Sequence, residues 1–148
     1  MTQIRTILVP VDFSQHSAEA LKVAIGLGKT FSATVHVLHA YHLPVSVTMP
    51  DAVVIPQSFW DSVRDAAARK LEKSCQTVGQ EGVTCESHLT AQTPSAAIAE
   101  TARQIGADLI VMGTRGLTGL KHVLLGSVAE RTVRTAPCPV MTVKGDEK

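Results

Sequence analysis

A glycine-rich segment near the C-terminus carries the clearest chemical signal in the 148-residue sequence. It runs from Gly113 to Ser127 and reads GTRGLTGLKHVLLGS. Glycine is used where a backbone must approach a ligand closely or adopt a positive φ. Gly126-Ser127 lies where a final helix is expected to begin, and the N–H groups and dipole of a helix N-terminus favour phosphate. The pattern therefore predicts a phosphate-binding segment, to which the Ser127 hydroxyl adds a donor.

The segment differs from the two best-known glycine-rich phosphate motifs. It contains no Gly-Lys-Ser/Thr, so it is not a Walker A loop, and the spacing after Gly113 does not match GxGxxG. The alternative is that the glycines only turn the chain from a strand into a helix. Four glycines and a serine in one segment favour a ligand site over that alternative.

Strand-like and helix-like blocks alternate around this segment. Short apolar runs predict strands at 4–11, 33–41, 83–89, 108–113 and 138–143, with helices between them. This alternation is typical of an α/β fold, an open five-stranded parallel sheet with helices on both faces. The length fits one domain, which we take as residues 1–148.

The polarity of the strands predicts their order in the sheet. The strands at 4–11 and 108–113 are the most apolar and are expected at the centre, whereas 83–89 alternates polar and apolar residues and is expected at an edge. Right-handed crossovers then favour the order 3-2-1-4-5. A crevice opens where the chain winds away from strands 1 and 4 in opposite directions. The segments Pro10 to Ser14 and Gly113 to Gly126 must meet there.

The composition argues against several classes of function. Hydrophobic residues make up 45% of the chain, which supports a folded core. The formal charge of +1 indicates no basic surface for nucleic acid or an anionic membrane, and no apolar run approaches the ~18 residues of a membrane span. The cysteines at 75, 85 and 138 cannot all pair and suggest no disulfide framework, so a cytoplasmic protein is expected.

Other candidate residues give weaker signals. His36, His39 and His42 raise the possibility of a metal site, but strand residues alternate between faces, and no cysteine or acid joins them at ligand spacing. A structural role is therefore favoured for these histidines. Asp12 could cap the first helix or bind the amides of its own turn. Cys138 lies between two prolines beside an apolar strand, which favours an inert thiol.

The motifs taken together resemble the universal stress protein family. The spacing Gly113-x2-Gly116-x9-Gly126-Ser127 is similar to the ATP-binding signature of that family. ILVPVDFS at 7–14, LIVMG at 109–113 and PCPV at 137–140 are similar to its first, fourth and fifth strands. The resemblance covers essentially the whole chain. It implies a single universal stress protein domain over 1–148, with an adenine nucleotide alpha hydrolase-like, Rossmann-like fold.

The resemblance also implies a ligand and its contacts. The ligand would be ATP with Mg²⁺, or AMP or another adenine nucleotide. Pro10, Val11 and Asp12 would flank the adenosine, with Asp12 near the ribose or a metal-bound phosphate, and Ala40 would meet adenine through its backbone. The ribose and the α- and β-phosphates would be wrapped by Met112, Gly113, Thr114, Arg115, Gly116, Leu117, Thr118 and Gly119. The terminal phosphates would meet Gly126, Ser127, Val128 and Ala129.

The function implied by the resemblance is an ATP-binding, nucleotide-responsive sensor or scaffold in the stress response. Hydrolysis would be slow, because neither a nucleophile elbow nor a strong general base is evident in the sequence. The alternatives are a nucleotide-free dimeric interaction module and a slow ATP-hydrolysing enzyme. A homodimer through the last strand, Cys138 to Val143, is expected, with protein partners unknown and no nucleic-acid or membrane partner. The proline-rich segment 42–57 is longer than an ordinary βα loop, which suggests a flap over the nucleotide or a partner surface, with a plain surface excursion as the alternative.

Overall fold

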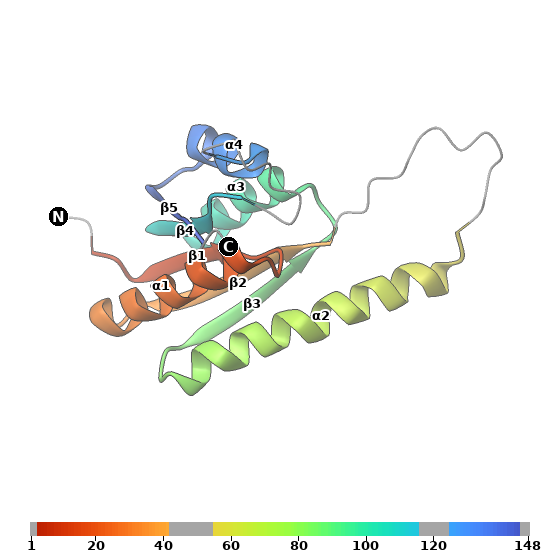
Figure 1. The fold of residues 1–148 in the computed structure, drawn as a ribbon, viewed down its shortest axis with the longest axis horizontal. Coiled ribbons are helices and arrows are strands. Elements are labelled where there is room, and N and C mark those ends of the chain that lie inside the picture. The colour runs from red at the N-terminus through yellow and green to blue at the C-terminus, as the bar shows by residue number, and fades with distance from the viewer. Residues whose placement is uncertain (1–2, 42–54, 116–124, 146–148) are drawn as a thin grey trace.

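Five parallel strands form one sheet in the computed structural model, which describes residues 3–41, 55–115 and 125–145 (Figure 1). The order β3-β2-β1-β4-β5 confirms the predicted topology and fold class. The strands are β1 (Thr6–Pro10), β2 (Thr34–Ala40), β3 (Cys85–Thr90), β4 (Leu109–Gly113) and β5 (Val140–Val143). The helices between them are α1 (Gln15–Phe31), α2 (Gln57–Gln80), α3 (Pro94–Ile105) and α4 (Ser127–Thr135).

Helices cover both faces of the sheet and create two apolar cores (Figure 1). Ile7 and Val9 of β1 point toward α1 and α2, whereas Leu8 points toward α3 and α4. All three side chains are fully buried. Successive strand residues face opposite sides, so a continuous apolar run is needed where both faces are covered. This explains why β1 lies at the centre of the sheet.

The helix boundaries follow from local sequence signals. Ser14 caps α1, and its side-chain oxygen accepts a hydrogen bond from the Ser17 N–H at 3.2 Å. Pro94 opens α3, where its missing N–H costs nothing, and Gly106 ends that helix at φ 63°. These three positions set the start of α1 and both ends of α3.

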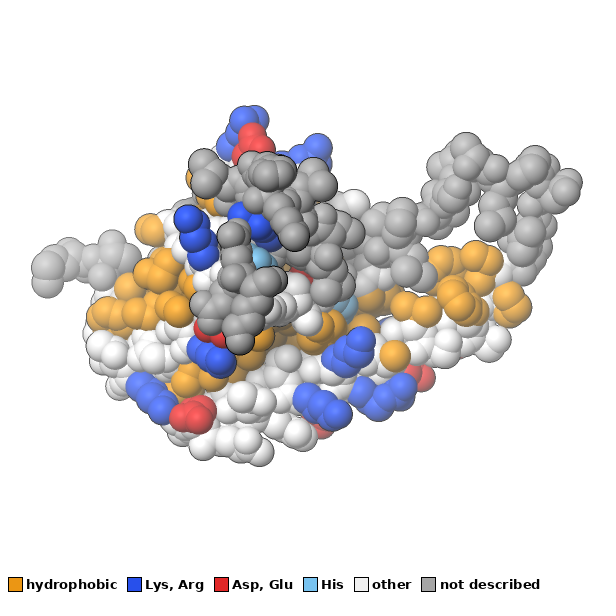
Figure 2. All heavy atoms as spheres, in the orientation of Figure 1, with side chains coloured by type: hydrophobic (Ala, Val, Ile, Leu, Met, Phe, Trp, Pro, Cys, Tyr) orange, Lys and Arg blue, Asp and Glu red, His pale blue; other side chains and the backbone are white. Residues whose placement is uncertain are grey.

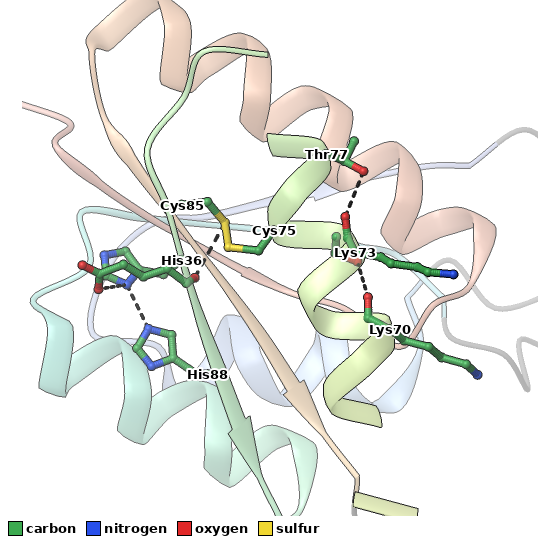
Figure 3. Close-up of a disulfide and its surroundings, with 9 residues drawn as sticks. His36, Lys70, Lys73, Cys75, Thr77, Cys85 and His88 are labelled. Atoms are coloured by element: carbon green, nitrogen blue, oxygen red, sulfur yellow. Dashed lines mark hydrogen bonds and ion pairs between the residues drawn. A yellow bond between two sulfur atoms is a disulfide. The ribbon is translucent and has the colours of Figure 1, made fainter. Parts of the chain in front are cut away.

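Cys75 of α2 and Cys85 of β3 form a disulfide (Figure 3). The turn after α2 reverses the chain, so residues ten apart in sequence come within a Cα–Cα distance of 5.7 Å. The pairing corrects the expectation of a chain without disulfides and leaves Cys138 as the free thiol. The cytoplasmic location, which rested partly on that expectation, stays a prediction.

The exposed surface mixes charged and apolar side chains. On the face shown in Figure 2, Lys and Arg side chains are dispersed and do not form one basic patch. Exposed Ile55 and Phe59 lie at the N-terminal end of α2. Among the described helices, none is both long and apolar enough to cross a membrane.

Candidate functional site

The carboxyl ends of β1 and β4 lie side by side, as the topology predicts. Ile7 pairs with Leu109 and Leu8 with Ile110, so both strands run in register toward the same edge. The first turn of α1 packs directly on Gly113 at the end of β4. A Cβ at this glycine would lie 2.8 Å from the Cβ of His16. The close approach requires glycine at 113 and brings the segments that follow β1 and β4 together.

The turn after β1 is held by its own polar groups. Asp12 accepts a hydrogen bond from the Ser14 N–H through Oδ1 at 3.0 Å, which is the Asx arrangement considered for this residue. Phe13 adopts φ 64°, a left-handed conformation that is uncommon outside glycine. Such strain persists only where the surroundings enforce it. The surrounding structure therefore fixes the conformation of this turn, which directly follows β1.

His39 at the end of β2 supports this turn from the side. Its Nδ1 donates to the Val11 carbonyl at 2.8 Å, and the imidazole lies 4.4 Å from the Phe13 ring, measured between centroids. The Lys70 ammonium sits 5.5 Å from the centre of the Phe13 ring. His36 and His39 lie on opposite faces of β2, as strand alternation predicts. His39 has the structural role predicted for it.

The predicted adenosine-binding residues surround this turn. Pro10 ends β1 and pairs with Leu38 of β2. Ala40, two residues after Leu38, ends β2. The N–H of Val11 donates to the Leu38 carbonyl at 2.8 Å, and its own carbonyl accepts from His39. The Val11 side chain is buried in the core under α1 and α2. Val11 therefore shapes the turn and offers little surface of its own.

Thr114 connects the two ends of the glycine-rich segment. Its N–H donates to the Val143 carbonyl at 3.1 Å, and its carbonyl accepts from the Gly126 N–H at 2.6 Å. Both ends of the segment are thus anchored at the end of β4. The intervening residues 116–124, including the predicted phosphate contacts Gly116, Leu117, Thr118 and Gly119, lie outside the described residues. The Met112 side chain is buried against α3 and α4, so its predicted contact with a ligand would be through its backbone.

The N-terminus of α4 lies at the same place. Gly126 is the N-cap residue, in an extended conformation and without a side chain to cap the helix. The first N–H of the helical ladder is that of Glu130, which donates to the Gly126 carbonyl at 3.0 Å. The N–H groups of Ser127, Val128 and Ala129 precede it and have no acceptor within the helix, the arrangement by which helix N-termini bind anions. Ser127 is exposed and Ala129 is buried, so the contact of Ala129 with a ligand would be through its backbone.

His16 was not identified from the sequence. Its Nδ1 accepts from the Gly145 N–H at 2.9 Å and lies 3.4 Å from Oγ1 of Thr114. The residue connects α1, the end of β4 and the segment after β5. Nothing in its sequence position signals this, because the contacts depend on how α1 crosses the sheet.

This fold and this crevice define an α/β protein of Rossmann-like architecture, with a candidate anion site at the topological switch point. Residues 3–144 match the model of the universal stress protein family, and the chain belongs to that family. A universal stress protein of Methanocaldococcus jannaschii, MJ0531, is 35% identical over 97% of this chain and 84% of its own length. A universal stress protein of Thermus aquaticus is 37% identical over 95% of this chain and 98% of its own.

Solved structures show the same fold. The structure of protein MJ0577 superimposes with a TM-score of 0.82 at 25% identity, covering 99% of this chain and 100% of that one. A universal stress protein in complex with cAMP has a TM-score of 0.69 at 23% identity, covering 98% of this chain and 100% of that one. One from Archaeoglobus fulgidus in complex with dAMP has a TM-score of 0.67 at 22% identity, covering 97% and 100%.

Proposed function

We propose that the protein binds ATP with Mg²⁺ in the crevice between the carboxyl ends of β1 and β4. The observation that carries this proposal is the start of α4. Gly126 caps the helix without a side chain, and its N–H is held by the Thr114 carbonyl at the end of β4. The first N–H groups of α4 and the exposed Ser127 hydroxyl are thereby presented to phosphate at the switch point of the sheet.

The adenosine end of the ligand would lie toward β1 and β2. The turn at Asp12, which the contact between Phe13 and His39 supports, would form one side of the adenosine site next to Ala40. Fold relatives in complex with cAMP and dAMP favour an adenine base over other bases. Magnesium fits this arrangement, because it keeps several waters and is held largely by nucleotide phosphates. Asp12 would contact the ion or its waters, and the ion would neutralise phosphate charge.

The described crevice favours binding over rapid turnover. Its two histidines, His16 and His39, each use Nδ1 in a hydrogen bond to the main chain. These bonds give both histidines a structural role, and slow hydrolysis is expected because the sequence shows neither a nucleophile elbow nor a strong general base. The protein would then act as a nucleotide-responsive sensor or scaffold in the stress response, with ATP bridging the Asp12 turn and the start of α4. Nucleotide occupancy would alter the surface offered to protein partners.

We also propose a homodimer formed through β5. The carbonyls of Pro139 and Val143 accept from the N–H groups of Ile110 and Thr114, so the intervening Thr142 directs its N–H and carbonyl toward the outer edge. Met141 is 39% exposed at this edge. An exposed, partly apolar edge strand invites pairing with a second copy. Antiparallel pairing of two β5 strands would extend the sheet across the dimer.

Two measurements test the nucleotide proposal. Freshly purified protein is heat-denatured, and released nucleotide is identified by chromatography and mass. Near one equivalent of ATP per chain is the expected result. Protein that releases none is titrated calorimetrically with Mg-ATP, AMP and cAMP in parallel. Tightest binding of Mg-ATP supports the proposal, tighter AMP or cAMP redirects it to that nucleotide, and no heat with any of them favours the nucleotide-free interaction module.

A further inference from the structure

Three metal-ligating side chains converge on the face of the sheet that carries α3. His36 lies on β2, and Glu86 and His88 lie on the neighbouring strand β3. The parallel register pairs His36 with Glu86 and Leu38 with His88. Residues 36, 86 and 88 therefore project to the same face from two adjacent strands. Figure 3 shows His36 and His88 on the opposite side of these strands from the Cys75–Cys85 disulfide.

The distances between the ligand atoms suit a small divalent cation. Nδ1 of His36 lies 2.9 Å from Nε2 of His88 and 3.4 Å from Oε2 of Glu86, and all three atoms lie within 4.8 Å of one another. Ligands at about 2.0–2.1 Å from tetrahedral zinc are about 3.3 Å apart. Small side-chain rotations would thus place all three atoms around one ion.

The three-residue cluster is buried at His36 and open to solvent at Glu86. His36 is 8% exposed in the middle of β2, whereas the Glu86 side chain is 63% exposed. His88 also lines an open cleft of about 320 Å³ between the ends of β2 and β3 and the helix α3. Glu100 and Gln104 of α3 line the same cleft, and its described lining contains no Lys or Arg. The local charge therefore favours a cation with access from solvent.

We propose that His36, Glu86 and His88 form a zinc-binding site with three protein ligands and a fourth position open toward the cleft. Two imidazoles and one carboxylate are a ligand set that zinc prefers when one position is left for water or a small ligand. The site lies on the α3 face of β2, away from the turn that His39 supports on the other face. It does not depend on nucleotide binding.

The spacing of histidines along the sequence does not predict the His36–Glu86–His88 cluster. Strand alternation places His36 and His39 on opposite faces of β2, so these two histidines cannot share an ion. The acid and the second histidine come instead from β3, 50 and 52 residues later in the chain. Their contact depends on the β2–β3 register, which no spacing within one strand reveals.

The test is calorimetric titration of the full chain with Zn²⁺ after chelator treatment, without nucleotide or thiol reagent. One equivalent of Zn²⁺ per chain is expected, with affinity at least tenfold weaker in Glu86→Gln and in His88→Gln. Glu130→Gln makes the same change on α4 and should leave zinc affinity unaltered. Equal affinity in the wild type and both ligand variants, or no binding at all, overturns the proposal.

Cobalt provides a second readout that reports the ligand geometry. Co²⁺ bound in a tetrahedral site gives visible absorption bands that are far more intense, and at longer wavelength, than those of Co²⁺ in water. The bands are expected in the wild type and in Cys138→Ser, which removes the free thiol, and they should be lost in Glu86→Gln. Loss of the bands in Cys138→Ser would assign the metal to the thiol and refute the proposed site. A circular dichroism spectrum of each variant establishes that it is folded.

Discussion

The N-terminus of α4 can be tested by replacing Ser127 with proline. Proline is well tolerated at the first helical position, where the N–H has no partner within the helix. The residue before a proline must be extended, and Gly126 already has φ −68° and ψ 166°. Ser127→Pro therefore removes one amide donor and one hydroxyl from the proposed phosphate site while preserving the helix.

The expected loss follows from the strength of a hydrogen bond to a charged group. Such bonds contribute about 1.5–3 kcal/mol, and because Ser127 is exposed we take the lower end. The Kd for Mg-ATP should rise about tenfold or more in Ser127→Pro. Ser127→Ala keeps the amide and removes only the hydroxyl. The ratio of the two Kd values isolates the contribution of the backbone N–H.

The assay is calorimetric titration of both variants with Mg-ATP and with adenosine. Adenosine carries no phosphate, so its affinity should be the same in Ser127→Pro as in the wild type. Thermal unfolding provides the check that the proline variant is folded. Equal Mg-ATP affinity in the proline and alanine variants would refute the reasoning, and so would a fall in adenosine affinity as large as that for Mg-ATP.

Three other predictions concern stability, assembly and reactivity. Gly113→Ala places a Cβ 2.8 Å from the Cβ of His16 and should lower the free energy of unfolding by about 1–3 kcal/mol, measured by denaturant unfolding. The control Gly26→Ala in α1 meets nothing within 4 Å, so this variant should be as stable as the wild type or more stable. Thr142→Pro removes the outward N–H of β5 and should give a monomer by light scattering. Thr142→Ala keeps this N–H and should remain dimeric. A dimer in both variants would contradict pairing through this edge. Burial raises the pKa of the Cys138 thiol, so alkylation of the native protein at pH 7.5 should be slower than that of an unperturbed cysteine. The alkylation rate should increase with pH beyond 9. Equal rates for Cys138 and an unperturbed cysteine at pH 7.5 would contradict this prediction.

The strand order was predictable because burial leaves a direct trace in composition. β1 and β4 are covered on both faces, and their uninterrupted apolar runs indicate central positions. The polar residues Glu86 and His88 mark β3 as an edge strand. The Ser14 and Gly106 signals are equally local, since a cap depends on the conformation of one residue and the amides next to it. Apolar runs and helix caps can both be recognised from short stretches of consecutive residues.

The placement of the candidate sites has a different origin. The approach of His16 to Gly113, the Cys75–Cys85 disulfide and the His36–Glu86–His88 cluster all join residues from different elements. Each depends on helix crossing or on strand register, which are set by packing of the whole core. The sequence alone determined the class of fold, and it predicted the edge at which a ligand would bind and the glycine-rich segment that would contact it. The tertiary structure decided which side chains meet, because contacts between elements arise only when the apolar faces of the helices close on the sheet.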